Sequence, residues 1–216
     1  MSVQRRGRRL DAAHSPIQQL PWSQPKLTLE PTRIVSDDQI EQIHRQSLKV
    51  LEEIGMDVVY PEARDIYAKA GAKVDGDRVR IGRDIVEEAM RTPPAEFTFH
   101  ARNPEHNIQI GGKWIAFAPV GGPPNCSDLD RGRRPGTLED NGNFVKLSQF
   151  FNCVHTAGGG SVDALDVHAS IRHLHIMRNK VRFSDKVPFV VSTGRHRLFD
   201  SLEIACWPRA SRSARR

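Results

Sequence analysis

Three groups of small and polar residues in the second half of the sequence follow apolar runs that end in glycine. Glycine allows the backbone to approach a ligand closely or to adopt a positive φ. Asn and Asp beside it could face a ligand, hydrogen-bond to their own backbone in an ordinary turn, or cap a helix. The candidate ligand-binding residues are Gly121, Gly122, Asn125, Asp128 and Asp130 in the first group, Gly158, Gly159, Gly160 and Asp163 in the second, and Thr193 and Gly194 in the third.

The histidines and cysteines form no convincing metal-binding or nucleophilic pattern. If residues 163–179 form one helix, His168 and His175 lie about 10 Å apart along it, and His173 points elsewhere. One metal ion with bonds of about 2 Å cannot reach all three, so we predict packing or surface histidines and no metal site. Cys126 has no His or Asp partner at a meaningful spacing, so an ordinary small loop residue is expected.

The three groups are positioned by apolar runs that alternate with predicted helices. In chain order, strands and helices are predicted over residues 115–120, 137–151, 153–157, 163–179, 187–191 and from residue 195 onward. Strands that are apolar on both faces and alternate with helices indicate parallel βαβ units. Glycines at the carboxyl end of each strand suit a TIM (β/α)8 barrel, whose active-site loops lie at that face. Glycines that merely permit sharp turns would give the same pattern.

The preceding sequence predicts shorter elements. Residues 1–33 are rich in Arg, Gln and Pro, and we expect either an arm that lies on something else or a disordered lead-in. Residues 34–113 predict a mixed α+β region. Its helices are expected over residues 36–54, 61–70 and 83–91, its hairpins over residues 73–81 and 108–114, and a strand around Phe97 and Phe99.

The positive charge of the chain belongs to its two ends. The formal net charge is +6 and the sequence pI is about 9.5. The arginines concerned are Arg5, Arg6, Arg8, Arg9, Arg209, Arg212, Arg215 and Arg216. Without these eight the remaining charge is −2. Solvated basic ends are therefore expected, and no nucleic-acid partner. The mixed-charge run at residues 128–134 predicts a solvated loop, with docking to an acidic partner as the alternative.

The cysteines and the apolar content indicate the compartment. Cys126, Cys153 and Cys206 form no CxxC pair and no even disulfide framework, which favours a reducing environment. No apolar stretch approaches the roughly 20 residues of a membrane span. The N-terminal arginines precede no apolar segment of the kind found in secretory signals. We therefore predict a cytoplasmic protein without a membrane partner.

Several long segments match a known family in its own order. They are VLEEIGMDV (50–58), AGAKVDGDRVRI (70–81), FTFHARNPEHNIQIGG (97–112), VGGPPNCSDLDRGRRPGTLED (120–140), VHTAGGGSVDALDVH (154–168) and RHLHIMRNKVRFSDKVPF (172–189). Together with the arginine-rich start, QRRGRR (4–9), they resemble the trimethylamine methyltransferase family, including its members without pyrrolysine. The resemblance covers residues 36 to about 205.

The resemblance implies a fold, an activity and a partner. The expected fold is a TIM barrel preceded by an α+β region. The expected activity transfers a methyl group from trimethylamine, or from a quaternary amine such as glycine betaine, to the cobalt of a corrinoid. Because a separate small protein carries that corrinoid, no cofactor is expected on this chain, and the cognate corrinoid protein is the expected partner. A homo-oligomer is compatible with the resemblance.

Two features depart from the family pattern. Family members are more than twice as long, so residues 114–205 would supply only about the first three βα units. The pyrrolysine position would lie outside the chain, and the catalytic residues remain unassigned. Residues 206–216 lose the family pattern, which predicts a frameshift or a truncated gene. Strands without barrel closure have unpaired edges. We therefore expect no turnover by this chain alone, and an inactive remnant or interaction fragment is the alternative function.

Overall fold

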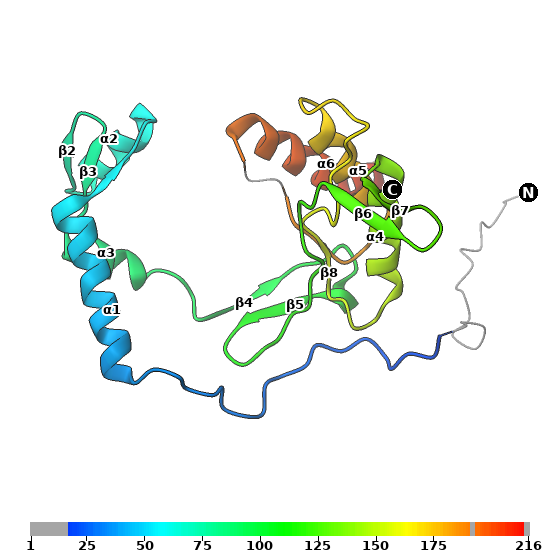
Figure 1. Cartoon of the computed structure of the whole chain (residues 1–216), viewed down its shortest axis with the longest axis horizontal. Coiled ribbons are helices and arrows are strands. Elements are labelled where there is room, and N and C mark those ends of the chain that lie inside the picture. Colours follow the sequence, from blue (N-terminus) through cyan, green and yellow to red (C-terminus); the bar gives the residue numbers. More distant parts are fainter. Residues whose placement is uncertain (1–16, 191–192, 214–216) are drawn as a thin grey trace, which may run out of the picture. The chain divides into compact units, whose positions relative to one another are not determined.

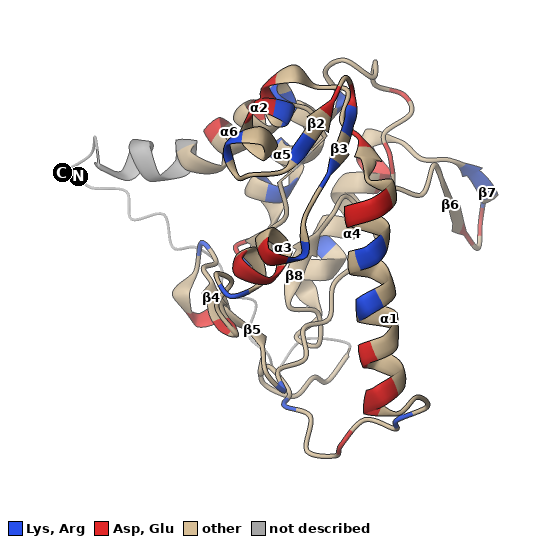
Figure 2. Cartoon of the chain, turned by 90° about the vertical axis from the view of Figure 1, so that its left-hand side faces the viewer, with Lys and Arg blue, Asp and Glu red and all other residues tan. Residues whose placement is uncertain are grey.

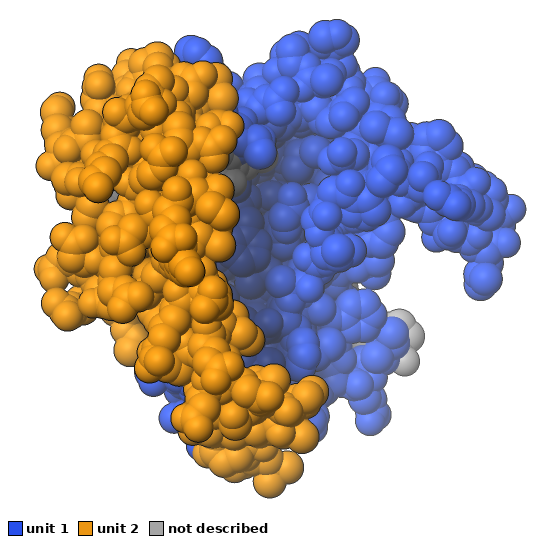
Figure 3. Space-filling view, turned by 60° about the vertical axis from the view of Figure 1, so that its left-hand side comes forward, with its two compact units in different colours: residues 1–27, 96–216 blue, residues 28–95 orange. Residues whose placement is uncertain are grey.

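The computed structural model describes residues 17–190 and 193–213, with side chains described as far as residue 206. The chain forms two compact units (Figure 3). Unit 1 comprises Met1–Leu27 and Glu96–Arg216, and unit 2 comprises Thr28–Ala95. The boundary at residues 95–96 falls within the region 34–113 that the sequence pattern grouped together.

Unit 2 contains a small antiparallel sheet and three helices (Figure 1). Its elements are α1 (Asp37–Lys49), a π-helical turn η2 (Val50–Ile54), β1 (Met56–Asp57), α2 (Pro61–Lys69), β2 (Lys73–Asp75), β3 (Arg78–Arg80) and α3 (Arg83–Met90). The sheet order is β1-β3-β2. Both the predicted helix start and the predicted hairpin are confirmed: Ser36 and Gln39 form a capping box before α1, and Gly76 turns between β2 and β3 with φ +59°.

Gly55 determines where the long N-terminal helix ends. Its φ is +74°, and its N–H donates to the carbonyl of Val50 at 2.8 Å. A Cβ at this position would lie 2.3 Å from the carbonyl oxygen of Val79, in the central strand of the sheet. Only glycine fits so close to that strand, and the helix therefore stops at the predicted residue.

Unit 1 contains short two-stranded sheets and three longer helices. Its elements are β4 (Glu96–Phe99), η3 (Pro104–His106), β5 (Ile108–Gly111), β6 (Asn125–Asp128), β7 (Gly132–Pro135), α4 (Leu138–Phe150), β8 (Thr156–Gly158), α5 (Arg172–Phe183), β9 (Val187–Pro188) and α6 (Arg195–Ser213). Helix α4 packs on α5, and α5 packs on α6. Within the described residues, no helix is both long and apolar enough to cross a bilayer.

The predicted hairpin at residues 108–114 is wrong. Strand β5 instead pairs antiparallel with β4, with Phe97 opposite Ile110 and Phe99 opposite Ile108. Trp114 forms an isolated antiparallel bridge with Lys26. In this pairing, apolar side chains of the two strands lie opposite each other at alternate positions. A hairpin that turned at Gly111 would have left Phe97 and Phe99 without these partners.

Among the described residues of unit 1, one pair of strands is parallel. Strands β8 and β9 pair in parallel, with Thr156 opposite Val187. The apolar run at residues 115–120, however, does not form the predicted strand. Its Phe117 carbonyl accepts from the N–H of His155 at 2.9 Å, but the Phe117 N–H donates to the side-chain Nδ1 of His155 at 2.8 Å. This run therefore lies beside β8, but the N–H of Phe117 is bound to a side chain. The regular backbone hydrogen bonds of a strand pair do not form.

The predicted helix at residues 163–179 begins nine residues later, at Arg172. The reason lies in the backbone donors of the preceding segment. The N–H of Asp163 donates to Pro123 at 2.9 Å, and the N–H of Leu165 donates to Gly136 at 2.8 Å. Donors used in these long-range bonds cannot form helical bonds. Asp163 therefore does not cap this helix, whose N-cap is Ile171.

Residues 17–27 of the N-terminal arm lie on unit 1. The side chains of Gln24 and the backbone of Gln109 exchange two hydrogen bonds, at 2.7 and 2.8 Å. The side chain of Gln19 accepts from the N–H of Asn152 at 2.8 Å, and the Asn152 amide donates to the carbonyl of Leu20 at 2.8 Å. Residues 17–27 are therefore held on unit 1 by specific amide contacts.

A candidate site at two glycine loops

The first two predicted loops meet in the structure. A Cβ added to Gly121 would lie 3.3 Å from the Cα of Gly159, so the two backbones touch. The bonds from Asp163 and Leu165 to the first loop hold them together. Gly136 closes the same junction, since a Cβ there would lie 2.3 Å from Cγ2 of Val162. These backbone segments could not approach in this way if Gly121 and Gly136 carried larger side chains.

Asn141 of helix α4 holds the second loop through hydrogen bonds to its backbone. Its side chain is fully buried, and its amide donates to the carbonyls of Gly160 at 2.5 Å and Val162 at 3.1 Å. Its own oxygen accepts from Nδ2 of Asn179 in α5 at 3.1 Å. Two helices therefore support the loop through one amide pair. A buried amide with all its partners in place holds a unique geometry.

Ser161 ends this loop in an unusual conformation. It is the one described non-glycine residue with a positive φ, at +52°. It is 8% exposed, and its hydroxyl has no hydrogen-bond partner among the described residues. Backbone strain and an unsatisfied buried hydroxyl both oppose folding, and such features concentrate at functional sites.

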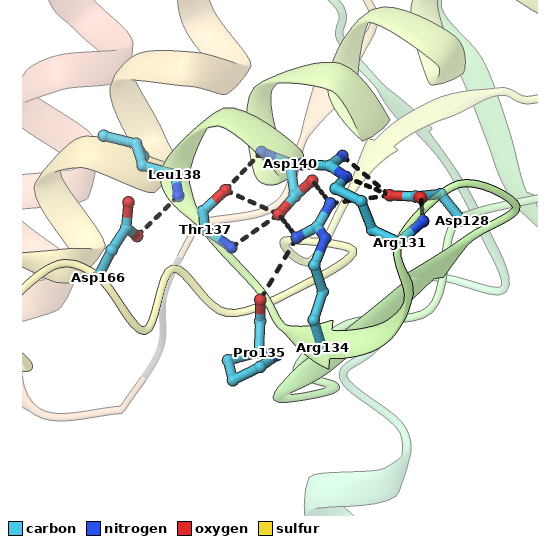
Figure 4. A network of polar contacts seen from close by, with 8 residues as sticks. All are labelled: Asp128, Arg131, Arg134, Pro135, Thr137, Leu138, Asp140 and Asp166. Atoms are coloured by element: carbon cyan, nitrogen blue, oxygen red, sulfur yellow. Dashed lines mark hydrogen bonds and ion pairs between the residues drawn. The ribbon is translucent and has the colours of Figure 1, made fainter.

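An ion-pair network holds the first loop on helix α4 (Figure 4). Arg134 of β7 binds both oxygens of Asp140 in a bidentate pair, at 2.5 and 2.6 Å, and also contacts Asp128 at 3.1 Å. Thr137 donates its backbone N–H and hydroxyl to the same Asp140 carboxylate, at 3.0 and 2.7 Å. The side chain of Arg134 is 19% exposed, so the prediction of a solvated loop is wrong at this residue.

The protonation of this network follows from its contacts. The hydrogen bonds from Arg134, and next those from Thr137, hold the pKa of Asp140 well below its usual range. The backbone N–H of Arg131, together with the Arg131 and Arg134 side chains, lowers the pKa of Asp128. Burial, and then the neighbouring Asp140 carboxylate, raise the pKa of the Cys126 thiol. The carboxylates are therefore ionised and the thiol is protonated, which agrees with a structural Cys126.

The predicted site residues separate into two sets. The structure brings together Gly121, Gly159, Gly160 and Asp163 at the junction of the two loops, and Gly122 adjoins them with open space around it. Asn125 and Asp128 lie on β6, and Asp128 is engaged in the ion-pair network. Asp130 lies at the exposed end of the β6–β7 hairpin. Thr193 lies in the exposed loop before α6, and residues 191–192 fall outside the described part of the chain.

A small cavity of about 240 Å³ adjoins the second loop. Its walls are uncharged and mainly apolar: Pro119, Val120, Phe144, Leu147, Phe151 and Val154, with Ser148 and Ser161. Such walls suit methyl groups better than ions. Among the described residues, no group of three or more His, Cys, Asp or Glu side chains could hold a metal ion. His173, one of the three histidines considered for a metal, instead contacts Asp200 of α6 at 2.8 Å.

Three positioning residues were missed by the sequence pattern. Asn141 carries no local signal, because its partners lie about 20 and 38 residues away. Arg134 and Asp140 had a partial signal, since Thr137 and Asp140 form a capping box at the start of α4. Arg134, which binds the Asp140 of this capping box, could be recognised in the sequence only as one of several charged residues in a polar run.

Comparison with known proteins identifies the family. The family model described as trimethylamine methyltransferase (MTTB) matches residues 2–210. The chain therefore belongs to the trimethylamine methyltransferase family.

Individual relatives have more specific names. The chain is 41% identical to the glycine betaine methyltransferase of Desulfitobacterium hafniense strain Y51 over 80% of this chain and 36% of the relative. It is 29% identical to a trimethylamine methyltransferase of another strain of that species, over 65% of this chain and 29% of the relative. It is 31% identical to the proline betaine:corrinoid methyltransferase of Eubacterium limosum, over 62% of this chain and 28% of the relative. The chain thus spans about a third of the length of these relatives.

Proposed function

We propose that this chain forms the N-terminal part of a methyltransferase that transfers a methyl group from a quaternary amine to the corrinoid of a partner protein. The observation that carries the proposal is the identity of 41% to a glycine betaine methyltransferase, against 29% to a trimethylamine methyltransferase of the same species. A betaine-like substrate is therefore favoured over trimethylamine. The relative from Eubacterium limosum, which is named as a corrinoid methyltransferase, supports the corrinoid acceptor.

The proposed reaction moves one methyl group without a proton. The bond between carbon and nitrogen breaks, its electron pair stays on nitrogen, and a tertiary amine leaves. Reduced cobalt of the partner's corrinoid supplies the electron pair for the new bond. The protein contributes by positioning the methyl group and by excluding water, and not by general acid–base catalysis.

The junction of the two glycine loops is the proposed substrate-facing surface of this chain. Gly121 and Gly159 are exposed there and carry no side chain, so that a small substrate can approach their backbone, and the buried Gly160 lies beside them. The uncharged cavity beside Ser161 provides apolar walls of the kind that suit methyl groups. In the proposed (β/α)8 barrel these loops follow the first strands, at the face where barrel active sites lie. The rest of the substrate pocket would come from strands beyond those described.

A second candidate function is a remnant or interaction fragment without turnover of its own. It is favoured by one observation: the described part of unit 1 contains a single pair of parallel strands, β8 and β9, and no closed barrel. Open parallel edges give no enclosed pocket in which to orient a substrate.

One experiment separates the two functions. The chain is co-expressed with the remaining two thirds of the glycine betaine methyltransferase of Desulfitobacterium hafniense and with a reduced corrinoid protein. Glycine betaine or trimethylamine is then added, and the demethylated amine is measured by mass spectrometry. The proposal predicts dimethylglycine formation by the combined protein, faster than demethylation of trimethylamine, and none by the chain alone. Absence of product from a soluble, co-purifying pair would favour the remnant.

A further inference from the structure

We propose that helix α1 is a self-association surface, through which two copies of this chain pair in antiparallel orientation. One side of α1 and its flanks carries a shallow, uncharged groove. Its lining includes Val35, Gln39, Gln42, Ile43, Gln46 and Val50. All six are exposed, and Ile43 is 62% exposed in the middle of the groove.

Val35 precedes the N-cap Ser36, and the five other residues, from Gln39 to Val50, form one stripe along the helix. At 100° per residue they fall within an arc of about 100°, which is the width of a helix face that packs against another element. The charged residues of α1 lie outside this arc. A stripe of this kind, without a charge along about three turns, is unusual for a helix face that only meets water, where charged side chains dominate.

The stripe is symmetric in sequence about the point between Gln42 and Ile43. Val35 and Val50 are equally far from that point, and so are Gln39 and Gln46. An antiparallel pair with a twofold axis there places Gln39 opposite Gln46 of the second copy, where two amides can exchange hydrogen bonds. It places Gln42 opposite Ile43 of the second copy. An interface between identical chains about a twofold axis requires this self-complementarity.

The charges along α1 favour the same orientation. Figure 2 shows acidic residues at the beginning of the helix and basic residues further along. Asp38, Arg45 and Lys49 border one side of the stripe. In an antiparallel pair Asp38 of one copy lies between Arg45 and Lys49 of the second copy, and the helix dipoles also oppose each other. A parallel pair would instead place like charges side by side.

The first test measures mass against concentration. One short helix pair buries less area than a standard stable interface, so the full chain should dimerise weakly, with a midpoint of about tens of micromolar. Sedimentation equilibrium of the wild-type chain should show this transition. Ile43→Glu places two carboxylates beside the axis and should shift the midpoint more than about 10-fold. Val59→Glu changes a side chain that is 78% exposed outside the stripe and should leave the midpoint unchanged.

The second test fixes the orientation with disulfides, in a chain in which the exposed Cys153 and Cys206 are replaced by serine. Mixed Gln39→Cys and Gln46→Cys chains should form the heterodimer on mild oxidation. Gln39→Cys alone should not crosslink, because its two copies lie about 10 Å apart along the axis, beyond the reach of a disulfide. A monomer at all concentrations, a dimer that resists Ile43→Glu, or preferred crosslinking of Gln39→Cys to itself would each overturn the proposal.

Discussion

The pairing of Arg134 with Asp140 joins the loop after residue 120 to helix α4, and both side chains are mostly buried. Asp140→Asn removes the negative charge but keeps the shape, and leaves Asp128 as the one described carboxylate that pairs with Arg134. Loss of one partner from a buried ion pair destabilises by about 3 kcal/mol. We expect this loss in the free energy of unfolding, measured with urea.

A double-mutant cycle controls this measurement. Arg134→Met combined with Asp140→Asn should destabilise less than the sum of the two single changes, because the second change leaves no new unpaired charge. Equal and additive effects would mean that the two side chains act independently, and would contradict the role assigned to the pair.

Lys180 gives a prediction for alkaline pH. Its ammonium group donates to the carbonyl of Phe189 at 2.7 Å, and burial lowers its pKa from 10.5 to about 8. Between pH 8 and 10.5 the unfolded chain still binds the proton that the folded chain has released. The free energy of unfolding should therefore rise with pH across this interval, by up to about 3 kcal/mol from this residue.

Lys180→Met tests this linkage. The variant should show a flatter dependence of the free energy of unfolding on pH between 8 and 10.5, whereas Lys69→Met, at an exposed lysine, should follow the wild-type curve. If the slopes of wild type and Lys180→Met coincide, Lys180 titrates alike in the folded and unfolded chains.

At the scale of elements, Gly136 joins the two loops. Gly136→Ala places a methyl group 2.3 Å from Val162 and 2.6 Å from the carbonyl oxygen of Asp163. Because part of the obstacle is backbone, we expect a loss of about 3 kcal/mol in the free energy of unfolding. The matched change, Gly159→Ala, meets its nearest atom at 3.5 Å and should cost less than about 1 kcal/mol. Similar losses in the two variants would contradict the close junction.

The sequence pattern correctly predicted those elements that are stabilised by residues close to them in the sequence. The capping box at Ser36, the glycine after η2 and the β2–β3 hairpin were all predicted, because neighbouring residues supply their hydrogen bonds. The segment at residues 163–171 was predicted wrongly, since its donors bind carbonyls near residues 123 and 136. The local pattern of apolar residues contains no information about a hydrogen bond between residues that are 30 or 40 positions apart. The contact of Gly121 with Gly159 was expected only in outline, from parallel strands whose carboxyl ends meet at one edge.

At the scale of the whole molecule, the proposed barrel depends on strands that neighbour β8 and β9. The described residues give the parallel pair and the run at residues 115–120 beside it. If the proposal is correct, the free edge of β9 is completed by a further parallel strand, and the loops at its carboxyl end then surround a substrate. In the chain alone that edge would stay unpaired, which disfavours a stable pocket.

Hydrogen exchange at residues 187–190 tests this account most directly. Exchange is measured by mass spectrometry for the chain alone and for the chain co-purified with the remaining two thirds of the Desulfitobacterium hafniense relative. The proposed barrel predicts that exchange of the segment containing β9 slows at least about 10-fold in the complex, because its edge amides become paired. A complex in which this segment exchanges as fast as in the chain alone would contradict the account.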